Sequence, residues 1–227
     1  MSHFDWKQLF NPEFYILLEL GGFKIGLFVV LFIVFSETGL LAGFFLPGDS
    51  LLFLAGIYSQ TLMIQFSTNN DFLDVSLLAT LIAFMAILGN MTGYWFGAKS
   101  GHFLYNRPDN IFFKQKYLHQ SKDFFEKYGS KAIVFARFLP ILRTFAPVIA
   151  GLVAMDKKKF MLFNIIGSFV WAFSMTFAGH YLHKLFLEKF NIDLKHYIEY
   201  IVICIVLFTT FPVIFKLLKK KINHESE

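Results

Sequence analysis

The sequence predicts an all-helical integral membrane protein with about four transmembrane helices and two re-entrant helical hairpins, arranged as an inverted repeat. Composition is the first reason, because 56% of the 227 residues are hydrophobic and only 16% are charged. In soluble domains about a quarter of the residues are charged. The other two reasons are that two long apolar runs are interrupted by proline, and that these runs share a sequence pattern. We therefore expect residues 1–227 to form a single membrane domain.

The N-terminal part predicts an interfacial segment followed by a membrane span. Residues 1–12 mix aromatic and apolar side chains with polar ones, as segments at a membrane surface do. The chain is then apolar from Phe14 to Phe35 except for Glu19 and Lys24. This length is about the 20 residues that a membrane-spanning helix needs. We expect the first span there.

The next segment, residues 37–58, predicts a re-entrant hairpin. The Pro47-Gly48 pair in its middle cannot continue a helix. Such an interruption is tolerated at membrane depth only where protein or a polar cavity surrounds the backbone. We therefore expect two half-helices that enter and leave the membrane on one side.

A polar loop and a second span follow. The loop, residues 59–74, contains Asp71 and Asp74 but no lysine or arginine. Residues 75–98 are apolar and long enough to cross the membrane. Glycines recur every four residues along this helix, a spacing that places them on one face where another backbone can approach closely. These glycines are Gly89, Gly93, Gly97 and Gly101.

The second half of the chain repeats this organisation. Residues 99–130 are basic and amphipathic, and we expect them to be cytoplasmic. The apolar run 131–155 is interrupted by Pro140 and Pro147, which predicts a second re-entrant hairpin. Third and fourth spans are expected at 160–183 and 197–217, followed by a basic tail at 218–227.

The distribution of positive charge predicts the orientation. Lysine and arginine collect on the cytoplasmic side of membrane proteins, so segment 99–130, residues 157–159 and the tail should share that side. With four crossings, both termini are then cytoplasmic and loop 59–74 is outside. The net charge of +5 needs no nucleic acid to explain it, since no basic stripe is interleaved with exposed aromatics. We expect no nucleic-acid partner.

An internal repeat connects the two hairpins. The first contains Phe45-Leu46-Pro47 and then Ala55-Gly56, and the second contains Phe138-Leu139-Pro140 and then Ala150-Gly151. In the topology above, the hairpins enter from opposite faces. Inverted repeats with interrupted helices are typical of transporters that build a binding site near the membrane midplane.

Four ionisable residues lie within the predicted hairpins, namely Glu37, Asp49, Arg137 and Arg143. A charge in a membrane usually faces a partner or a wet cavity. Two of the chain's three arginines lie in this one motif, and the guanidinium fork can bind a carboxylate or a phosphate through two hydrogen bonds. A purely structural alternative is that the acids neutralise the arginines, with Asp49 capping a helix.

Histidines give a weaker indication of function. His180 and His183 are three residues apart at the end of a span, but no third ligand is close in the sequence. We expect no metal and no cofactor, and we read both histidines as interfacial residues. The sequence also shows no nucleophile paired with histidine at the arginine motif, so we do not expect an enzyme.

The sequence resembles the DedA family of bacterial inner-membrane proteins, related to the VTT-domain lipid scramblases of eukaryotes. The resemblance covers residues 30–180 and rests on Glu37-x-Gly39 followed by FFLPGDSLLFLAG, on GYWFG within the glycine-bearing helix, and on FARFLPILRTFAPVIAG with the following Gly-Ser-x-x-Trp. The sequence departs from the family at Asn90, where many relatives carry an acid.

This resemblance implies lipid transport driven by the proton-motive force, with recycling of undecaprenyl phosphate in the bacterial inner membrane as the expected activity. Arg137 and Arg143 would bind the phosphate head group, while Glu37 and Asp49 would take up protons. The partners would be a polyprenyl phosphate and protons, and a homo-oligomer stays open. The alternatives are a proton-coupled ion or small-molecule antiporter, a phospholipid scramblase or flippase, a membrane phosphatase, or a structural protein.

Overall fold

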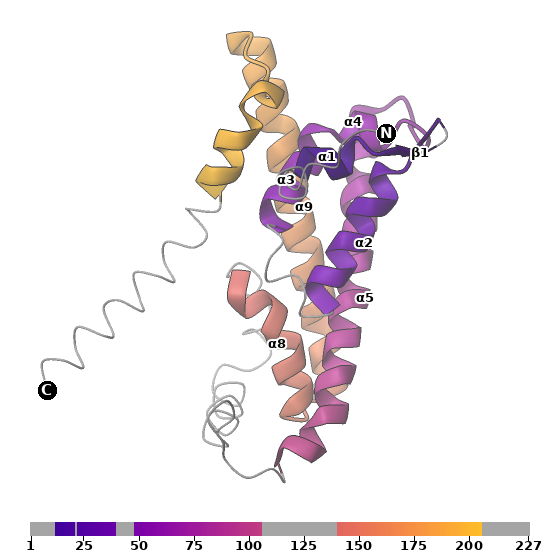
Figure 1. Ribbon diagram of the computed structural model, residues 1–227, viewed down its shortest axis with the longest axis vertical. Helices are drawn as coiled ribbons and strands as arrows, with labels where there is room; N and C mark the ends of the chain where they lie inside the picture. The colour runs from indigo at the N-terminus through magenta and orange to yellow at the C-terminus, as the bar shows by residue number, and fades with distance from the viewer. Residues whose placement is uncertain (1–11, 21, 40–47, 106–139, 206–227) are drawn as a thin grey trace, which may run out of the picture.

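Two long antiparallel helices, α5 (Asp71–Tyr105) and α9 (Lys157–Phe190), form the axis of the computed structural model (Figure 1). The structure describes residues 12–20, 22–39, 48–105 and 140–205. Asp71 and His180 meet at one end of the pair, and Tyr94 Oη donates to the carbonyl of Met155 towards the other, at 2.5 Å.

Both helices are long and apolar enough to cross a membrane, over Asp71–Ser100 and Lys157–Phe190. They cover the spans predicted at 75–98 and 160–183, so a helical fold with apolar spans is confirmed. Local sequence fixes where α9 begins and ends. The Asp156 side chain accepts a 2.8 Å hydrogen bond from Lys159 N, and Asn191 ends the helix in the left-handed conformation, with a φ of 55°.

Two shorter helices, α3 (Gly48–Ile57) and α8 (Pro140–Leu152), pack against the long pair. Helix α3 lies on α9: a Cβ at Gly56 would overlap the carbonyl oxygen of Thr176, and one at Gly179 would overlap that of Phe53.

Helix α8 lies on α5 in the same manner. A Cβ at Gly97 would overlap the carbonyl oxygen of Val148, and one at Gly151 would overlap that of Tyr94. The Ala-Gly step of each sequence repeat thus packs against a glycine on the long helix of the other repeat. Glycine permits this because its missing side chain lets two helix backbones touch.

The N-terminal residues differ from the prediction. The expected continuous helix over residues 14–35 is wrong, because α1 (Pro12–Ile16) and α2 (Gly26–Gly39) are separated by a small antiparallel hairpin of β1 (Glu19–Leu20) and β2 (Phe23–Lys24). A positive φ of 86° at Gly22 lets the chain turn.

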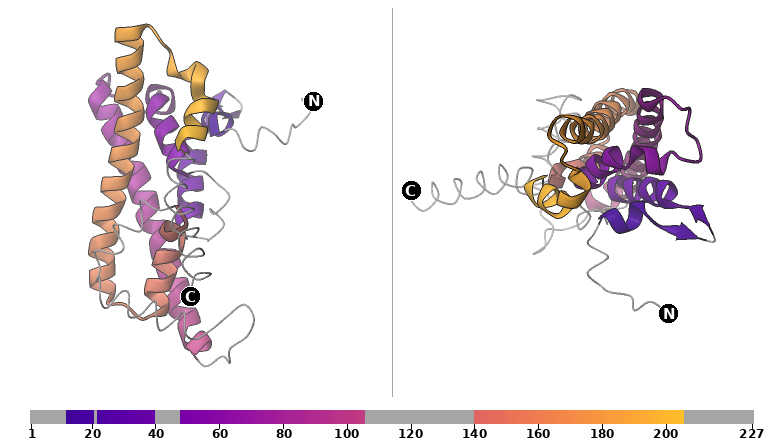
Figure 2. Two further views of the ribbon diagram at one scale, coloured as in Figure 1. Left: turned by 90° about the vertical axis from the view of Figure 1, so that its left-hand side faces the viewer. Right: turned by 90° about the horizontal axis from the view of Figure 1, so that it is seen from above.

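Both ends of this hairpin region lie at the same end of the bundle. Tyr58 Oη donates to the Glu13 carboxylate, and Gln65 Nε2 donates to the Lys24 carbonyl at 3.4 Å. Residues 12–20 and 22–25 therefore lie beside 58–65 and do not cross to the far side. We call this end of the molecule the α4 end, after α4 (Ser59–Leu62), and Figure 2 shows it from above in its right-hand view.

The expected break at Pro147 is also wrong, because α8 continues through it to Leu152. Proline removes one helical hydrogen bond, the one to the carbonyl of Arg143, and here this loss does not end the helix. Pro140 is the first residue of α8, where a missing N–H costs little.

The main apolar core joins α1, α2, α3, α5 and α9 near the α4 end, with Leu52, Ile82 and Trp171 among its fully buried residues. The outer faces of the long helices carry large exposed apolar side chains, such as Phe84, Trp95 and Leu162. Water disfavours such a surface, whereas the lipid interior accommodates it.

Some predictions fall on residues outside the described ranges. These are the interfacial segment up to residue 11, the residues Pro47 and Arg137, the part of the basic segment from 106 to 130, and the tail at 218–227. Of the expected span at 197–217, residues 198–205 are described and are helical. They follow the short 3-10 helix η3 (Leu194–Tyr197).

Candidate functional site

The centre of the bundle contains a guanidinium held between two carboxylates. Arg143 of α8 donates from Nη2 to Glu37 Oε1 at the end of α2, and from Nη1 to Asp49 Oδ1 at the start of α3, at 2.5 Å. All three residues are buried, with 3% of Arg143, 0% of Glu37 and 6% of Asp49 exposed. The structure thus brings together three of the four predicted site residues, from three helices.

Trp171 of α9 is part of the same group. Its Nε1 donates a 2.8 Å hydrogen bond to Asp49 Oδ1, and the Arg143 guanidinium carbon lies 4.7 Å from the centre of its ring. A guanidinium over an indole face is attracted by the ring. This role of Trp171 was not predicted from the sequence, although the residue lies mid-span and tryptophan in membrane proteins usually lies at the interfaces.

The site retains polar atoms without hydrogen bonds. Among the described residues, Glu37 Oε2 and Arg143 Nε are buried and have no hydrogen-bond partner. A Cβ at Gly48 would overlap the Glu37 carboxylate, so only glycine lets the start of α3 approach this acid. The group therefore has capacity to bind a further polar atom.

The described site carries an excess of negative charge. Glu37 and Asp49 contribute two negative charges when ionised, and Arg143 contributes one positive charge. A buried net charge is costly in a low-dielectric environment, so a proton on one carboxylate or another cation is required for balance. Asp49 lies in the first turn of α3, where the helix dipole favours an anion.

Three of the glycines predicted to pack, Gly89, Gly93 and Gly97, face other helices. A Cβ at Gly89 would overlap Thr38 Oγ1 of α2, and Gly97 contacts Val148 of α8. Gly93 has more room, since a Cβ there would lie 3.5 Å from the Pro147 Cβ. Gly101 continues the series within α5.

Asn90 of α5 connects the two long helices. Its Nδ2 donates to Asn164 Oδ1 at 2.7 Å, and Asn164 Nδ2 donates to the carbonyl of Ile87 at 3.2 Å. Both asparagines are buried, at 1% and 0% exposure. The amide pair therefore stabilises contact between α5 and α9 without contributing a charge.

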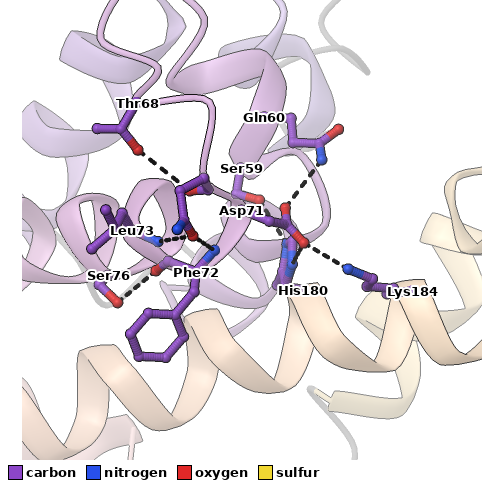
Figure 3. Close-up of polar contacts among 10 residues, drawn as sticks. Ser59, Gln60, Thr68, Asp71, Phe72, Leu73, Ser76, His180 and Lys184 are labelled. Carbon is purple, nitrogen blue, oxygen red and sulfur yellow. Dashed lines mark hydrogen bonds and ion pairs between the residues drawn. The ribbon is translucent and has the colours of Figure 1, made fainter.

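A second polar cluster lies at the α4 end and was missed by the sequence analysis (Figure 3). His180 of α9 contacts Ser59 Oγ through Nδ1 at 2.9 Å and Asp71 Oδ2 through Nε2 at 3.1 Å. Asp71 also accepts from Lys184 Nζ at 2.9 Å and from Gln60 Nε2 at 3.1 Å. Within the described part of the chain, no three His, Cys, Asp or Glu side chains are grouped as metal ligands.

The apolar helices and the buried ion cluster are consistent with a membrane protein whose polar site is enclosed by helices. Comparisons with known proteins identify the family. Residues 46–181 match the VTT domain. Protein DedA of Escherichia coli (strain K12) is 33% identical over 200 residues, which cover 88% of this chain and 85% of that protein.

Two further relatives are membrane proteins by name. Inner membrane protein YqjA of Escherichia coli (strain K12) is 30% identical over 190 residues, covering 79% of this chain and 74% of its own. An uncharacterized membrane protein of Mycobacterium tuberculosis (strain ATCC 25618 / H37Rv) is 39% identical over 183 residues, covering 81% and 74%. No solved structure matches the chain. The chain belongs to the DedA family of membrane proteins, and its apolar helices fit that membership.

Proposed function

We propose that the protein is a proton-coupled lipid transporter that carries a polyprenyl phosphate, undecaprenyl phosphate in particular, across the bacterial inner membrane. The observation that carries the proposal is the buried Arg143 bound by Glu37 and Asp49. The guanidinium of Arg143 is shared between carboxylates that come from two helices. It can exchange one of them for a phosphate oxygen.

The head group would bind where Arg143 now holds the two acids. A phosphate accepts two parallel hydrogen bonds from a guanidinium in the same geometry as a carboxylate does. Arg137, which lies outside the described residues, is proposed as the second cation on the phosphate. The isoprenoid chain is apolar and would stay in the surrounding lipid, against the exposed phenylalanine and leucine side chains of the long helices.

Proton coupling follows from the charge balance. With phosphate absent, the acids pair with Arg143; when phosphate enters, two carboxylates and a phosphate would compete for the same cation. Protonation of Glu37 or Asp49 removes a competing charge and lets the arginine bind phosphate. Loss of that proton on the other side restores the carboxylate and expels the lipid.

The proposed function also requires a particular arrangement of the helices in the membrane. We infer two re-entrant hairpins related as an inverted repeat, within about four crossings, and cytoplasmic termini. The reciprocal packing of α3 on α9 and of α8 on α5 supports the repeat. The protein would then act as a carrier and not as an enzyme, with lipid and protons as its partners.

Surface exposure of undecaprenyl phosphate in living cells tests the proposal. Cells depleted of the protein are stained with a head-group-specific probe, and rescued with wild type, Arg143→Ala or Arg143→Lys. We expect the lipid to accumulate outside and only wild type to clear it, since lysine has no planar fork.

Lys158→Ala is the matched control, because this exposed residue at the start of α9 has no place in the site. It should clear the lipid as wild type does. Unchanged exposure after depletion, in cells lacking paralogues, would rule out the polyprenyl phosphate. Full activity of Arg143→Lys would rule out binding of the phosphate through two parallel hydrogen bonds from the guanidinium. Transport of a labelled cation by the purified protein in lipid vesicles would instead favour the antiporter.

A further inference from the structure

The contacts of His180 fix which ring nitrogen carries its proton. Nε2 lies 3.1 Å from Asp71 Oδ2, and an ionised carboxylate only accepts hydrogen bonds, so Nε2 must be the donor. In the neutral ring Nδ1 then lacks a proton and accepts from the Ser59 hydroxyl at 2.9 Å. Asp71, His180 and Ser59 therefore form one directed chain of hydrogen bonds (Figure 3).

This chain leads from the surface into the interior. The Asp71 side chain is 29% exposed, the His180 side chain is 7% exposed, and Ser59 is completely buried. The same three residue types form the triads of hydrolases, but a nucleophilic serine must be reachable by substrate. A fully buried serine at the inner end suits proton transfer and not hydrolysis.

Helices α3 and α9 connect this cluster with the buried ion cluster. They run side by side, since Asp49 contacts Trp171 near the start of α3 and Ser59 contacts His180 beyond its end. Ten residues separate Asp49 from Ser59 in sequence, a rise of about 15 Å in helical geometry. Intermediate groups are therefore needed between the two sites.

Two buried hydroxyl groups lie along this stretch. Ser50 Oγ, next to Asp49, and Thr176 Oγ1, one helical turn before His180, are both buried and lack hydrogen-bond partners among the described residues. Buried polar atoms in proteins nearly always bond to protein or to ordered water. Water bound to these hydroxyls would continue the chain from Ser59 to Asp49.

We propose that His180, acting through Ser59, is the group by which Glu37 and Asp49 exchange protons with solvent at the α4 end. This inference rests on the proton coupling in the proposed function and adds the route that the protons take. His180 is a proton-transfer residue at a distance from the lipid site and does not touch the lipid.

The transfer balances at each atom. For an outward proton, the ring gives its Nε2 proton to the Asp71 carboxylate and takes the Ser59 hydroxyl proton at Nδ1. Ser59 Oγ regains a proton from the buried side, and Asp71 releases its proton to solvent. The ring then turns about its Cβ–Cγ bond and gives the Nδ1 proton to the Asp71 side, while Nε2 takes a proton from the Ser59 side. This second transfer runs in the same direction and restores the starting tautomer, and the ring turns back for the next cycle.

Among the residues that the structure describes, charged groups around the ring are few and lie mostly on the surface side. Asp71 comes from α5, while Lys184 and His183 lie on α9 itself. Asp193, before η3, lies 3.8 Å from His183 Nδ1, and Lys195 is in η3. Helix α4 contributes no titratable side chain, and α3 contributes only Asp49 at its far end. The polar side chains described on the inner side of His180 are therefore the hydroxyl groups of Ser59, Thr176 and Ser50.

Time-resolved infrared spectroscopy after a pH jump tests this route without any lipid substrate. The full chain is placed in lipid nanodiscs, and the carbonyl band of protonated carboxyl groups is assigned with Glu37→Gln and Asp49→Asn. We expect His180→Gln and Ser59→Ala to slow the appearance of this band at least tenfold without changing its final amplitude. His183→Gln and Ser76→Ala are matched substitutions at residues outside this chain of hydrogen bonds, and they should keep the wild-type rate.

The outcomes separate the two proposals. A carboxyl band that responds to pH in wild type, at a rate unchanged by His180→Gln and Ser59→Ala, would overturn the route and leave proton coupling intact. Equal slowing in all four variants would also overturn it, because a general structural effect would then explain the data. A wild-type protein with no carboxyl response would overturn proton coupling itself, and the route with it.

Discussion

Trp171 Nε1 donates a 2.8 Å hydrogen bond to Asp49 Oδ1, the same oxygen that Arg143 binds at 2.5 Å. The ion cluster is therefore tied to α9 as well as to α2, α3 and α8. A movement of α9 that breaks the bond from Trp171 would change how strongly Asp49 holds Arg143. This relationship supplies a mechanical connection between helix movement and lipid release in the proposed cycle.

Replacing Trp171 by phenylalanine should weaken transport while preserving the fold. The ring still fills the core, but Asp49 loses a donor, and a buried hydrogen bond to a charged group is worth about 1.5–3 kcal/mol. We expect the transport rate in vesicles to fall roughly tenfold. Trp95→Phe is the control, because Trp95 on α5 is 63% exposed. Equal activity of both variants would show that the indole N–H has no role.

Removing Arg143 should destabilise the protein more than removing the whole ion cluster. Arg143→Met leaves two buried carboxylates without their cation, and breaking a buried ion pair in this way costs about 3–5 kcal/mol. Adding Glu37→Gln and Asp49→Asn should restore most of the lost stability and none of the transport. Unfolding midpoints in detergent measure this effect. If Arg143→Met is as stable as wild type, then both carboxylates can become protonated without a loss of folding stability.

The glycine at the start of α3 should tolerate no side chain. Gly48→Ala would place a methyl group on the Glu37 carboxylate and separate it from Arg143, so we expect transport to be lost. Gly93→Ala should be active, since its Cβ would meet only ordinary contacts at 3.5 Å. Transport assays on Gly48→Ala and Gly93→Ala test this difference. Wild-type activity of Gly48→Ala would contradict the close approach of Gly48 to the Glu37 carboxylate.

The placement of the N-terminal hairpin predicts which residues are labelled from the same side. In a Cys204→Ser background, Glu19→Cys and Phe66→Cys should react with a membrane-impermeant thiol reagent from one face of the membrane. Lys158→Cys should react from the opposite face, because it lies at the other end of the bundle. Labelling of Glu19→Cys and Lys158→Cys from one face would contradict the fold.

The sequence was sufficient for the features that depend on composition and local pattern. Apolar length predicted α5 and α9, and the rarity of arginine pointed to Arg137 and Arg143, of which the structure describes Arg143. The cost of a charge within a membrane was enough to expect Glu37 and Asp49 as its partners, and the structure places all three in contact.

The errors came from features that an apolar run does not specify. Hydrophobicity over residues 14–35 does not distinguish one helix from two helices joined by a hairpin, although the Gly21-Gly22 pair is a known hairpin signal. Pro147 was expected to end a helix, but packing against α5 holds α8 together across it. Tertiary contact outweighed the lost hydrogen bond.

The cluster around His180 could not be predicted because its members are far apart in sequence. Ser59, Asp71 and His180 meet only when α9 packs antiparallel to α5 and alongside α3. Sequence spacing places His180 near His183 and suggests a metal site or an interface. Only the packing of the three helices shows that its partners are a hydroxyl and a carboxylate.

The central claim is tested most directly with purified protein in lipid vesicles that contain a fluorescent short-chain polyprenyl phosphate. A quencher added outside reports the fraction of head groups in the outer leaflet, with and without an imposed proton gradient. We predict that the gradient drives head groups to one leaflet with wild type, and that Arg143→Ala and Glu37→Gln abolish this movement. Head groups that redistribute equally with wild type, Arg143→Ala and empty vesicles would contradict transport through the buried ion cluster.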